Sequence, residues 1–205
     1  HALHGLLSDG NYPSLSGTSV KRDYVEFPSQ MMENWAIEPE VLATYARHYK
    51  TDEIIPQELI NKITNASKFN QGFATTEYVA ASYLDMAWHM EKQEIKDANL
   101  FEQKTLSALG LIDQITTRYR STYFSHIFAG GYSMGYYSYL RTEVLQADAF
   151  VPFSEKGIFD KKTANKLKKY IYSAGNSDDL MTQYIRYRGS EPKIEALLKK
   201  RGFDE

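Results

Sequence analysis

One stretch of sequence organises this chain: Phe124-Ser-His-Ile-Phe-Ala-Gly-Gly-Tyr-Ser-Met-Gly-Tyr-Tyr-Ser-Tyr-Leu140. Tyr132, Tyr136 and Tyr139 are spaced at i, i+4 and i+7 within it, and on a helix this spacing places three phenol groups on one face. The Gly130-Gly131 step just ahead of them breaks the helical pattern. We therefore expect a loop that leads into the N-terminus of a helix.

His126 lies on the other side of that glycine step. A flexible glycine hinge between a histidine and a row of phenol groups suits a site that closes over a bound ligand. The same residues also fit an aromatic core stripe that follows a tight turn. This stretch alone does not choose between the two interpretations.

The composition excludes several classes of site. The chain has 205 residues and a formal net charge of −2, and it contains no cysteine. Disulfides and thiolate metal sites are therefore excluded. Basic residues are spread along the chain without a block, so nothing indicates nucleic-acid binding. No apolar run reaches the length of about eighteen residues that a membrane helix needs.

The chain begins with a histidine rather than an initiator methionine. We interpret residues 1–205 as a fragment of a longer polypeptide, so the lack of a signal peptide carries no information. The sixteen tyrosines favour a polar-lined cleft, although tyrosines also cover ordinary surfaces.

The predicted fold class is all-α, because apolar residues recur with helical spacing and no alternating strand or internal repeat is present. Proline and capping residues set the expected helix ends. The expected helices span residues 1–8, 29–37, 39–49, 56–67, 70–94, 101–109, 112–117, the tyrosine stretch up to about residue 150, 161–174, 177–186 and 191–200.

The first residues contain a weak metal motif. His1 and His4 stand at i, i+3, so a helix would present both on one face. A pair of metal ligands is geometrically available there. Exposed histidines at a fragment end would give the same pattern.

Three longer blocks resemble the thimet oligopeptidase and neurolysin family of zinc metallopeptidases. His1-Ala-Leu-His-Gly-Leu-Leu-Ser8 is similar to the end of the family's H-E-F-G-H-A-L-H-G zinc-binding helix. Residues 15–35 resemble its third-ligand segment, and residues 124–140 resemble its tyrosine loop. The blocks occur in the family's order, and the resemblance covers essentially the whole chain. Residues 65–73 and 84–89 look most like the bacterial peptidyl-dipeptidases, with oligopeptidase A as the nearest alternative.

The resemblance implies a zinc site. His1 matches the second histidine of H-E-x-x-H, and Glu26 matches the third protein ligand, whereas His4 matches no ligand and is expected to be structural. The family's first zinc histidine and its general-base glutamate would lie upstream of His1. Residues 1–205 are thus expected to form the C-terminal portion of a helical, zincin-type catalytic domain whose upstream half is absent. We expect them to bind zinc weakly or not at all and to be inactive alone.

The resemblance also assigns roles around the tyrosine stretch. Tyr132 and Tyr139 match tyrosines that donate phenol O–H groups to the oxyanion formed from the scissile carbonyl. His126 matches a histidine that contacts the substrate or the transition state. Tyr136 matches a tyrosine at the cleft, and Arg22 has either a role near the cleft or an ordinary ion-pairing role. Gly130 and Gly131 would let the loop close over substrate, or they form a simple turn into the helix.

The implied activity is release of C-terminal dipeptides from short oligopeptides. An endo-acting peptidase like oligopeptidase A is one alternative, and a non-catalytic helical peptide-binding fragment is an alternative of another class. Arg22, Arg186 and Arg188 are candidates to bind the substrate carboxylate. The expected partners are short peptides and the missing N-terminal part of the polypeptide, with no nucleic acid or membrane. The expected compartment is the cytoplasm, with the periplasm as the second choice.

Overall fold

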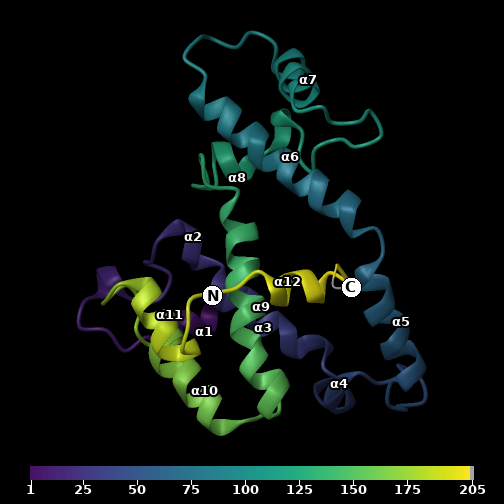
Figure 1. The fold of residues 1–205 in the computed structure, drawn as a ribbon, viewed down its shortest axis with the longest axis vertical. Helices are drawn as coiled ribbons and strands as arrows, with labels where there is room; N and C mark the ends of the chain where they lie inside the picture. The colour runs from purple at the N-terminus through teal and green to yellow at the C-terminus, as the bar shows by residue number, and fades with distance from the viewer. Residues whose placement is uncertain (204–205) are drawn as a thin grey trace. The chain divides into compact units, whose positions relative to one another are not determined.

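The computed structural model describes residues 1–203, which divide into two compact units (Figure 1). Unit 1 combines His1–Phe69 with the chain from Leu140 onward, and unit 2 is Asn70–Tyr139. Residues 1–203 form helices and contain no β-strand apart from an isolated antiparallel bridge between Arg47 and Ile54. The predicted all-α class is confirmed. None of the described helices is long and apolar enough to cross a membrane.

Unit 1 contains most of the helices. In chain order they are α1 (Ala2–Leu6), η1 (Pro13–Leu15), α2 (Arg22–Val25), α3 (Phe27–Glu33), η2 (Asn34–Ile37), α4 (Pro39–Tyr45), α5 (Gln57–Lys68), α9 (Ser138–Lys156, whose first two residues belong to unit 2), α10 (Lys161–Leu167), the π-helix η4 (Lys168–Tyr172), α11 (Leu180–Arg188) and α12 (Glu195–Lys200).

The core of unit 1 forms where α3 and α9 bring together side chains that are distant in sequence. Phe27 and Met31 of α3 are fully buried in the same cluster as Phe153 of α9. The Trp35 ring meets Phe150 and Phe153 edge-on, with ring centroids 4.9 and 4.8 Å apart. Full burial of one such apolar side chain contributes about 1.5–3 kcal/mol, so this cluster is a main source of stability in unit 1.

Helix α9 continues through Pro152 and past its predicted end near residue 150. Pro152 has no backbone N–H, so it cannot pair with the carbonyl of Asp148 four residues earlier. Arg188 supplies the missing donor, because its Nε lies 3.0 Å from that carbonyl oxygen. The predicted end near residue 150 is therefore wrong, and the helix reaches Lys156.

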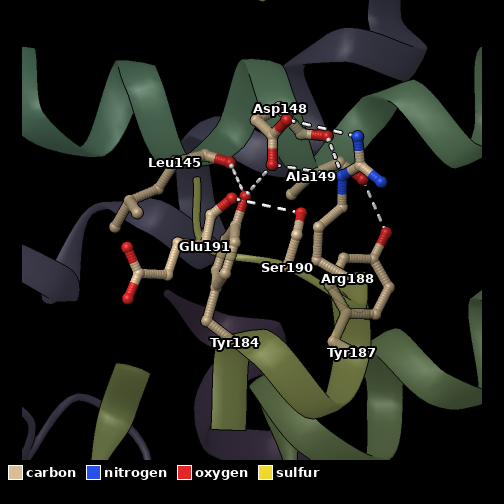
Figure 2. A network of polar contacts seen from close by, with 8 residues as sticks. All are labelled: Leu145, Asp148, Ala149, Tyr184, Tyr187, Arg188, Ser190 and Glu191. Carbon is tan, nitrogen blue, oxygen red and sulfur yellow. Dashed lines mark hydrogen bonds and ion pairs between the residues drawn. The ribbon is translucent and has the colours of Figure 1, made fainter. Parts of the chain in front are cut away.

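The same arginine pairs with the buried Asp148 carboxylate (Figure 2). Arg188 Nε and one terminal nitrogen lie 3.1 and 3.2 Å from the two carboxylate oxygens. The Tyr184 hydroxyl donates to the same carboxylate at 2.7 Å, and the Tyr187 hydroxyl donates to the Ala149 carbonyl at 2.6 Å. Burial, the largest cause, and the bond to Asp148 raise the pKa of Tyr184 well above its usual range, so the phenol stays protonated.

Unit 2 contains α6 (Gln71–Met90), α7 (Ala98–Ala108), η3 (Ser121–Tyr123) and α8 (Ser125–Phe128). Its core is a cluster of buried residues, with aromatic rings packed around it: Ala81, Phe124, Ile127 and Tyr136, then Tyr78, Trp88, Tyr119 and Tyr139. The buried carboxylate of Glu102 accepts the backbone N–H of Ser121 at 2.7 Å and pairs with Arg120. This carboxylate fixes the turn that precedes α8.

Most of the predicted helices are present, and most of them are shorter than predicted. Pro39 is the first residue of α4 as expected, but that helix ends at Tyr45 rather than at residue 49. Asp179 caps α11 by accepting the N–H of Thr182, and Gly189 ends it in the left-handed conformation. The helix predicted over residues 112–117 is wrong, because this segment consists of turns and irregular backbone.

Candidate functional site

In unit 1, the two predicted metal ligands lie together. His1 Nε2 is 3.0 Å from Glu26 Oε2, across twenty-five positions of sequence (26 − 1). Glu26 joins α2 to α3, and this break between two short helices presents its side chain. The Glu26 side chain is 9% exposed and the His1 side chain 48% exposed, so the pair opens to solvent on the histidine side.

Ser29 holds the Glu26 carboxylate in place. Its hydroxyl lies 3.1 Å from Glu26 Oε2 and 2.9 Å from the Glu26 backbone carbonyl. The Ser29 hydroxyl can therefore orient the nearly buried Glu26 carboxylate. Residues that do not bind a metal themselves commonly support its ligands through such hydrogen bonds. Sequence reasoning missed Ser29, although its position three residues after Glu26 at the start of a helix was a usable signal.

The environment of His4 differs from that of His1. Its side chain is fully buried, and its ring meets Tyr172 edge-on at 6.2 Å. Neither ring nitrogen has a hydrogen-bond partner within residues 1–203. Burial is the main cause that lowers the pKa of His4 from 6.5 to about 4. These features fit the structural role expected for His4.

No group of three or more His, Asp or Glu side chains suited to a metal ion occurs in the described part of the chain. His1 and Glu26 are therefore a pair of donors and not a complete set, since a protein zinc site normally has three or four.

In unit 2, the three tyrosines gather around His126, but not as one helix face. Tyr132 and Tyr136 lie in the turn before α9, and Tyr139 is the second residue of that helix. The prediction of a single helical face is therefore wrong, because the helix starts later than expected. The rings still converge: Tyr132 stacks on Tyr139 at 5.1 Å, and Tyr136 lies 5.5 Å from Tyr139.

His126 occupies the centre of this aromatic cluster. Its ring centroid lies 6.3 Å from both Tyr132 and Tyr139 and 5.7 Å from Tyr136. Tyr119, which sequence reasoning missed, lies 4.9 Å away. The buried Nδ1 atom of His126 has no hydrogen-bond partner within the described residues.

Burial of Tyr136 changes its acid–base behaviour. Desolvation raises the pKa of the Tyr136 phenol above its usual range, against the opposing effect of the Arg118 charge. The phenol therefore stays protonated even at alkaline pH. A protonated phenol can donate a hydrogen bond but cannot act as a base.

The glycine pair closes the turn after α8. A Cβ atom on Gly130 would lie 3.0 Å from the Cα and the carbonyl oxygen of His126, which is too close for any other residue without movement. Gly131 has a φ of 77°, in the left-handed region that glycine favours. The Tyr132 N–H then donates to the His126 carbonyl at 2.9 Å. The glycines thus set the approach of the tyrosine loop to His126.

The candidate carboxylate-binding arginines differ in their surroundings. Arg188 is committed to Asp148, and Arg186 pairs with Asp178 at 2.6 Å. Arg22 is the exposed first residue of α2, and its neighbour Asp23 pairs with Arg141 at 3.0 Å. The structure leaves Arg22 and Arg186 at the surface and removes Arg188 from this role.

Asp85 and His89 on α6 were also missed. The Asp85 carboxylate is buried, and its oxygens lie 3.0 and 2.9 Å from the backbone nitrogens of Met134 and Tyr136 in the tyrosine loop. His89 Nδ1 lies 2.9 Å from Asp85 Oδ1. An acid and a histidine at i, i+4 on an otherwise apolar helix face were the available signal.

The comparisons with known proteins all point to peptidases. The family model described as peptidase family M3 matches residues 1–203. The dipeptidyl carboxypeptidase of Escherichia coli K12 is 44% identical over 207 residues, which cover 100% of this chain and 30% of that protein. Oligopeptidase A of the same organism is 38% identical over 208 residues, with 98% and 30% covered. The chain thus spans about 30% of the length of these curated relatives.

Proposed function

The chain belongs to peptidase family M3, and on this premise we propose that residues 1–205 are the C-terminal portion of the catalytic domain of a zinc metallopeptidase. The observation that carries the proposal is the approach of His1 Nε2 to Glu26 Oε2, at 3.0 Å. An imidazole and a carboxylate from separate segments converge there, and these are two of the ligand types that zinc prefers.

The donor pair fits zinc in chemistry and spacing. Bonds of about 2.0–2.2 Å to a tetrahedral ion place two donor atoms about 3.4 Å apart, close to the separation of His1 and Glu26. A pair does not complete the site. We propose that the remaining zinc histidine and the general-base glutamate come from the preceding part of the same polypeptide. Zinc bound there would polarise a peptide carbonyl and lower the pKa of a water molecule to about 7.

The aromatic cluster would act on the substrate. Tyr132 and Tyr139 present phenol groups that can donate hydrogen bonds to the oxyanion of a cleaved peptide bond. His126 lies among them, and its buried Nδ1 atom has no hydrogen-bond partner within residues 1–203, so we propose that it pairs with a peptide group of the substrate. Tyr136 is buried beside Tyr139, with ring centroids 5.5 Å apart, and would support that phenol near the substrate. Gly130 and Gly131 would let the loop adjust when substrate binds.

The substrates we propose are short oligopeptides from which dipeptides are released at the C-terminus. This reading is supported by the identity of 44% to a relative named dipeptidyl carboxypeptidase. Such an enzyme needs a cation for the substrate carboxylate, and the exposed side chains of Arg22 and Arg186 are the candidates, whereas Arg188 is bound to the buried Asp148. The cytoplasm stays the expected compartment by family resemblance.

The metal assignment is tested by Glu26→Ala in the full-length parent polypeptide. We expect the variant to lose both bound zinc, measured by elemental analysis, and peptidase activity. His48→Gln is the matched control, because His48 is an exposed histidine that bonds only within its own turn. Full zinc content in the Glu26→Ala protein would remove the proposal's basis.

A second candidate, endo-acting cleavage, is favoured by the 38% identity to oligopeptidase A. The two activities are distinguished by measuring cleavage of N-acylated tripeptides and of longer peptides with a free or an amidated C-terminus. Loss of cleavage on amidation supports the dipeptidase, and retained internal cleavage supports the oligopeptidase. If the parent cleaves none of these peptides, a non-catalytic peptide-binding role is the better interpretation.

A further inference from the structure

Asp85 connects helix α6 to the backbone of the tyrosine loop. One carboxylate oxygen accepts the N–H of Met134 at 3.0 Å, and the other accepts the N–H of Tyr136 at 2.9 Å. The residue is 1% exposed, so water does not compete for these bonds. We propose that Asp85 is a positioning residue that fixes the loop carrying Tyr132, Tyr136 and Tyr139; its catalytic consequence rests on the proposed function.

The loop needs an external restraint. Met134 has a φ of 55°, in the left-handed region that a residue with a side chain rarely adopts. Such a conformation persists only where surrounding contacts hold it. The bond from the Met134 N–H to Asp85 is such a contact, and the adjacent bond from Tyr136 fixes the chain two residues later.

Tyr136 is held from both sides of its backbone. Its N–H donates to Asp85, and its carbonyl accepts the Tyr78 hydroxyl at 2.7 Å. Both partners belong to α6, so the tyrosine loop is anchored to a twenty-residue helix. Because the Tyr136 ring packs 5.7 Å from His126 and 5.5 Å from Tyr139, movement of this backbone would displace the whole cluster.

The surroundings of Asp85 identify it as an anchor. A buried carboxylate is stable only when its oxygens are paired. Asp85 has two backbone N–H donors and His89, whose Nδ1 lies 2.9 Å from Oδ1. Both oxygens are bonded within the unit and the residue is 1% exposed, so the carboxylate acts through the loop.

Hydrogen exchange in the full-length parent tests the anchor without reference to activity. Asp85→Ala is expected to raise the exchange rate of the Met134 and Tyr136 amides by about tenfold or more, since each loses its acceptor. Asp85→Asn keeps one acceptor oxygen and is expected to fall between wild type and Asp85→Ala. It also keeps the test valid if the alanine variant fails to fold.

Glu102→Ala is the matched control. Glu102 is also a buried carboxylate of unit 2 that accepts a backbone N–H, but at Ser121. We expect faster exchange at Ser121 in this variant and no local change at Met134 and Tyr136. Equal effects of both substitutions on the tyrosine loop, or no effect of Asp85→Ala there, would overturn the inference.

The catalytic consequence is tested in the full-length parent. Asp85→Ala is expected to lower kcat by about tenfold or more with little change in KM, because misplacement of a catalytic group by about 1 Å costs about 100-fold. Adding Met134→Gly is expected to restore part of kcat, since glycine adopts the left-handed conformation without strain.

The two proposals fail differently. An active parent whose kcat is unchanged by Asp85→Ala contradicts the positioning role and leaves the peptidase proposal standing. A wild-type parent without peptidase activity contradicts the proposed function, and the exchange experiment then decides the structural anchor alone.

Discussion

Arg188→Met should destabilise unit 1 more than any substitution of an exposed arginine. It removes the partner of a buried carboxylate and also the donor that satisfies the Asp148 carbonyl beside Pro152. Loss of one partner of a buried ion pair costs about 3–5 kcal/mol. The Arg188 side chain is 22% exposed and Tyr184 still donates to Asp148, so we expect the lower end, about 3 kcal/mol.

The measurement is urea unfolding followed by circular dichroism, with Arg186→Met as the control. Arg186 also pairs with an aspartate, but both partners are about half exposed, and such pairs contribute about 0.2–1 kcal/mol. A double-mutant cycle isolates the carbonyl contact. Pro152→Ala supplies a backbone N–H that can bond to the Asp148 carbonyl. The change in unfolding free energy on Pro152→Ala should therefore be about 1 kcal/mol more favourable in the Arg188→Met protein than in the wild type.

The reasoning would be refuted if Arg188→Met cost no more than Arg186→Met. It would be refuted in part if the cycle showed no coupling between positions 152 and 188. In that case the ion pair matters, but the capping of the helix carbonyl does not.

Three further predictions concern single residues. The contribution of His4 to the free energy of unfolding should fall by about 3 kcal/mol between pH 6.5 and pH 4, because the unfolded state protonates His4 in this range and the folded state does not. Denaturant titrations of His4→Leu should lack this part of the pH dependence. Gly175→Ala should lower the melting temperature more than Gly189→Ala: both positions have positive φ, but only at Gly175 would the new methyl overlap the Leu15 carbonyl. In the full-length parent, Tyr139→Phe should lower kcat by about 100- to 1,000-fold with little change in KM, and steady-state kinetics showing an unchanged kcat would exclude Tyr139 as an oxyanion donor.

The sequence predicted elements whose ends carry local signals. The cap-like segment Ser177-Asp-Asp-Leu predicted the start of α11, where Asp179 is the N-cap, because capping depends on residues within a few positions. The predicted end near residue 186 lies two residues short of Arg188, after which Gly189 ends the helix. The continuation of α9 through Pro152 was not predictable in the same way. It depends on Arg188, which is thirty-six positions away (188 − 152), and no local pattern reports that contact.

The candidate site shows the same division. The residue types in the tyrosine stretch were recognised, and Tyr132, Tyr136 and Tyr139 do gather around His126. Their spacing indicated a helix face, whereas a turn held by Asp85 brings them together. The pairing of His1 with Glu26 came from family resemblance, since two residues so far apart carry no joint signal in composition or periodicity.

Unit 1 is assembled from two separate lengths of chain, with all of unit 2 between them. During synthesis, α3 leaves the ribosome long before α9, the partner that buries Phe27 and Met31. At about 5–20 residues per second, the roughly 120 residues between Met31 and Phe153 take about 6–24 s to make. The apolar face of α3 must stay unaggregated for that interval, so nascent chains halted before α9 should be the ones that chaperones retain.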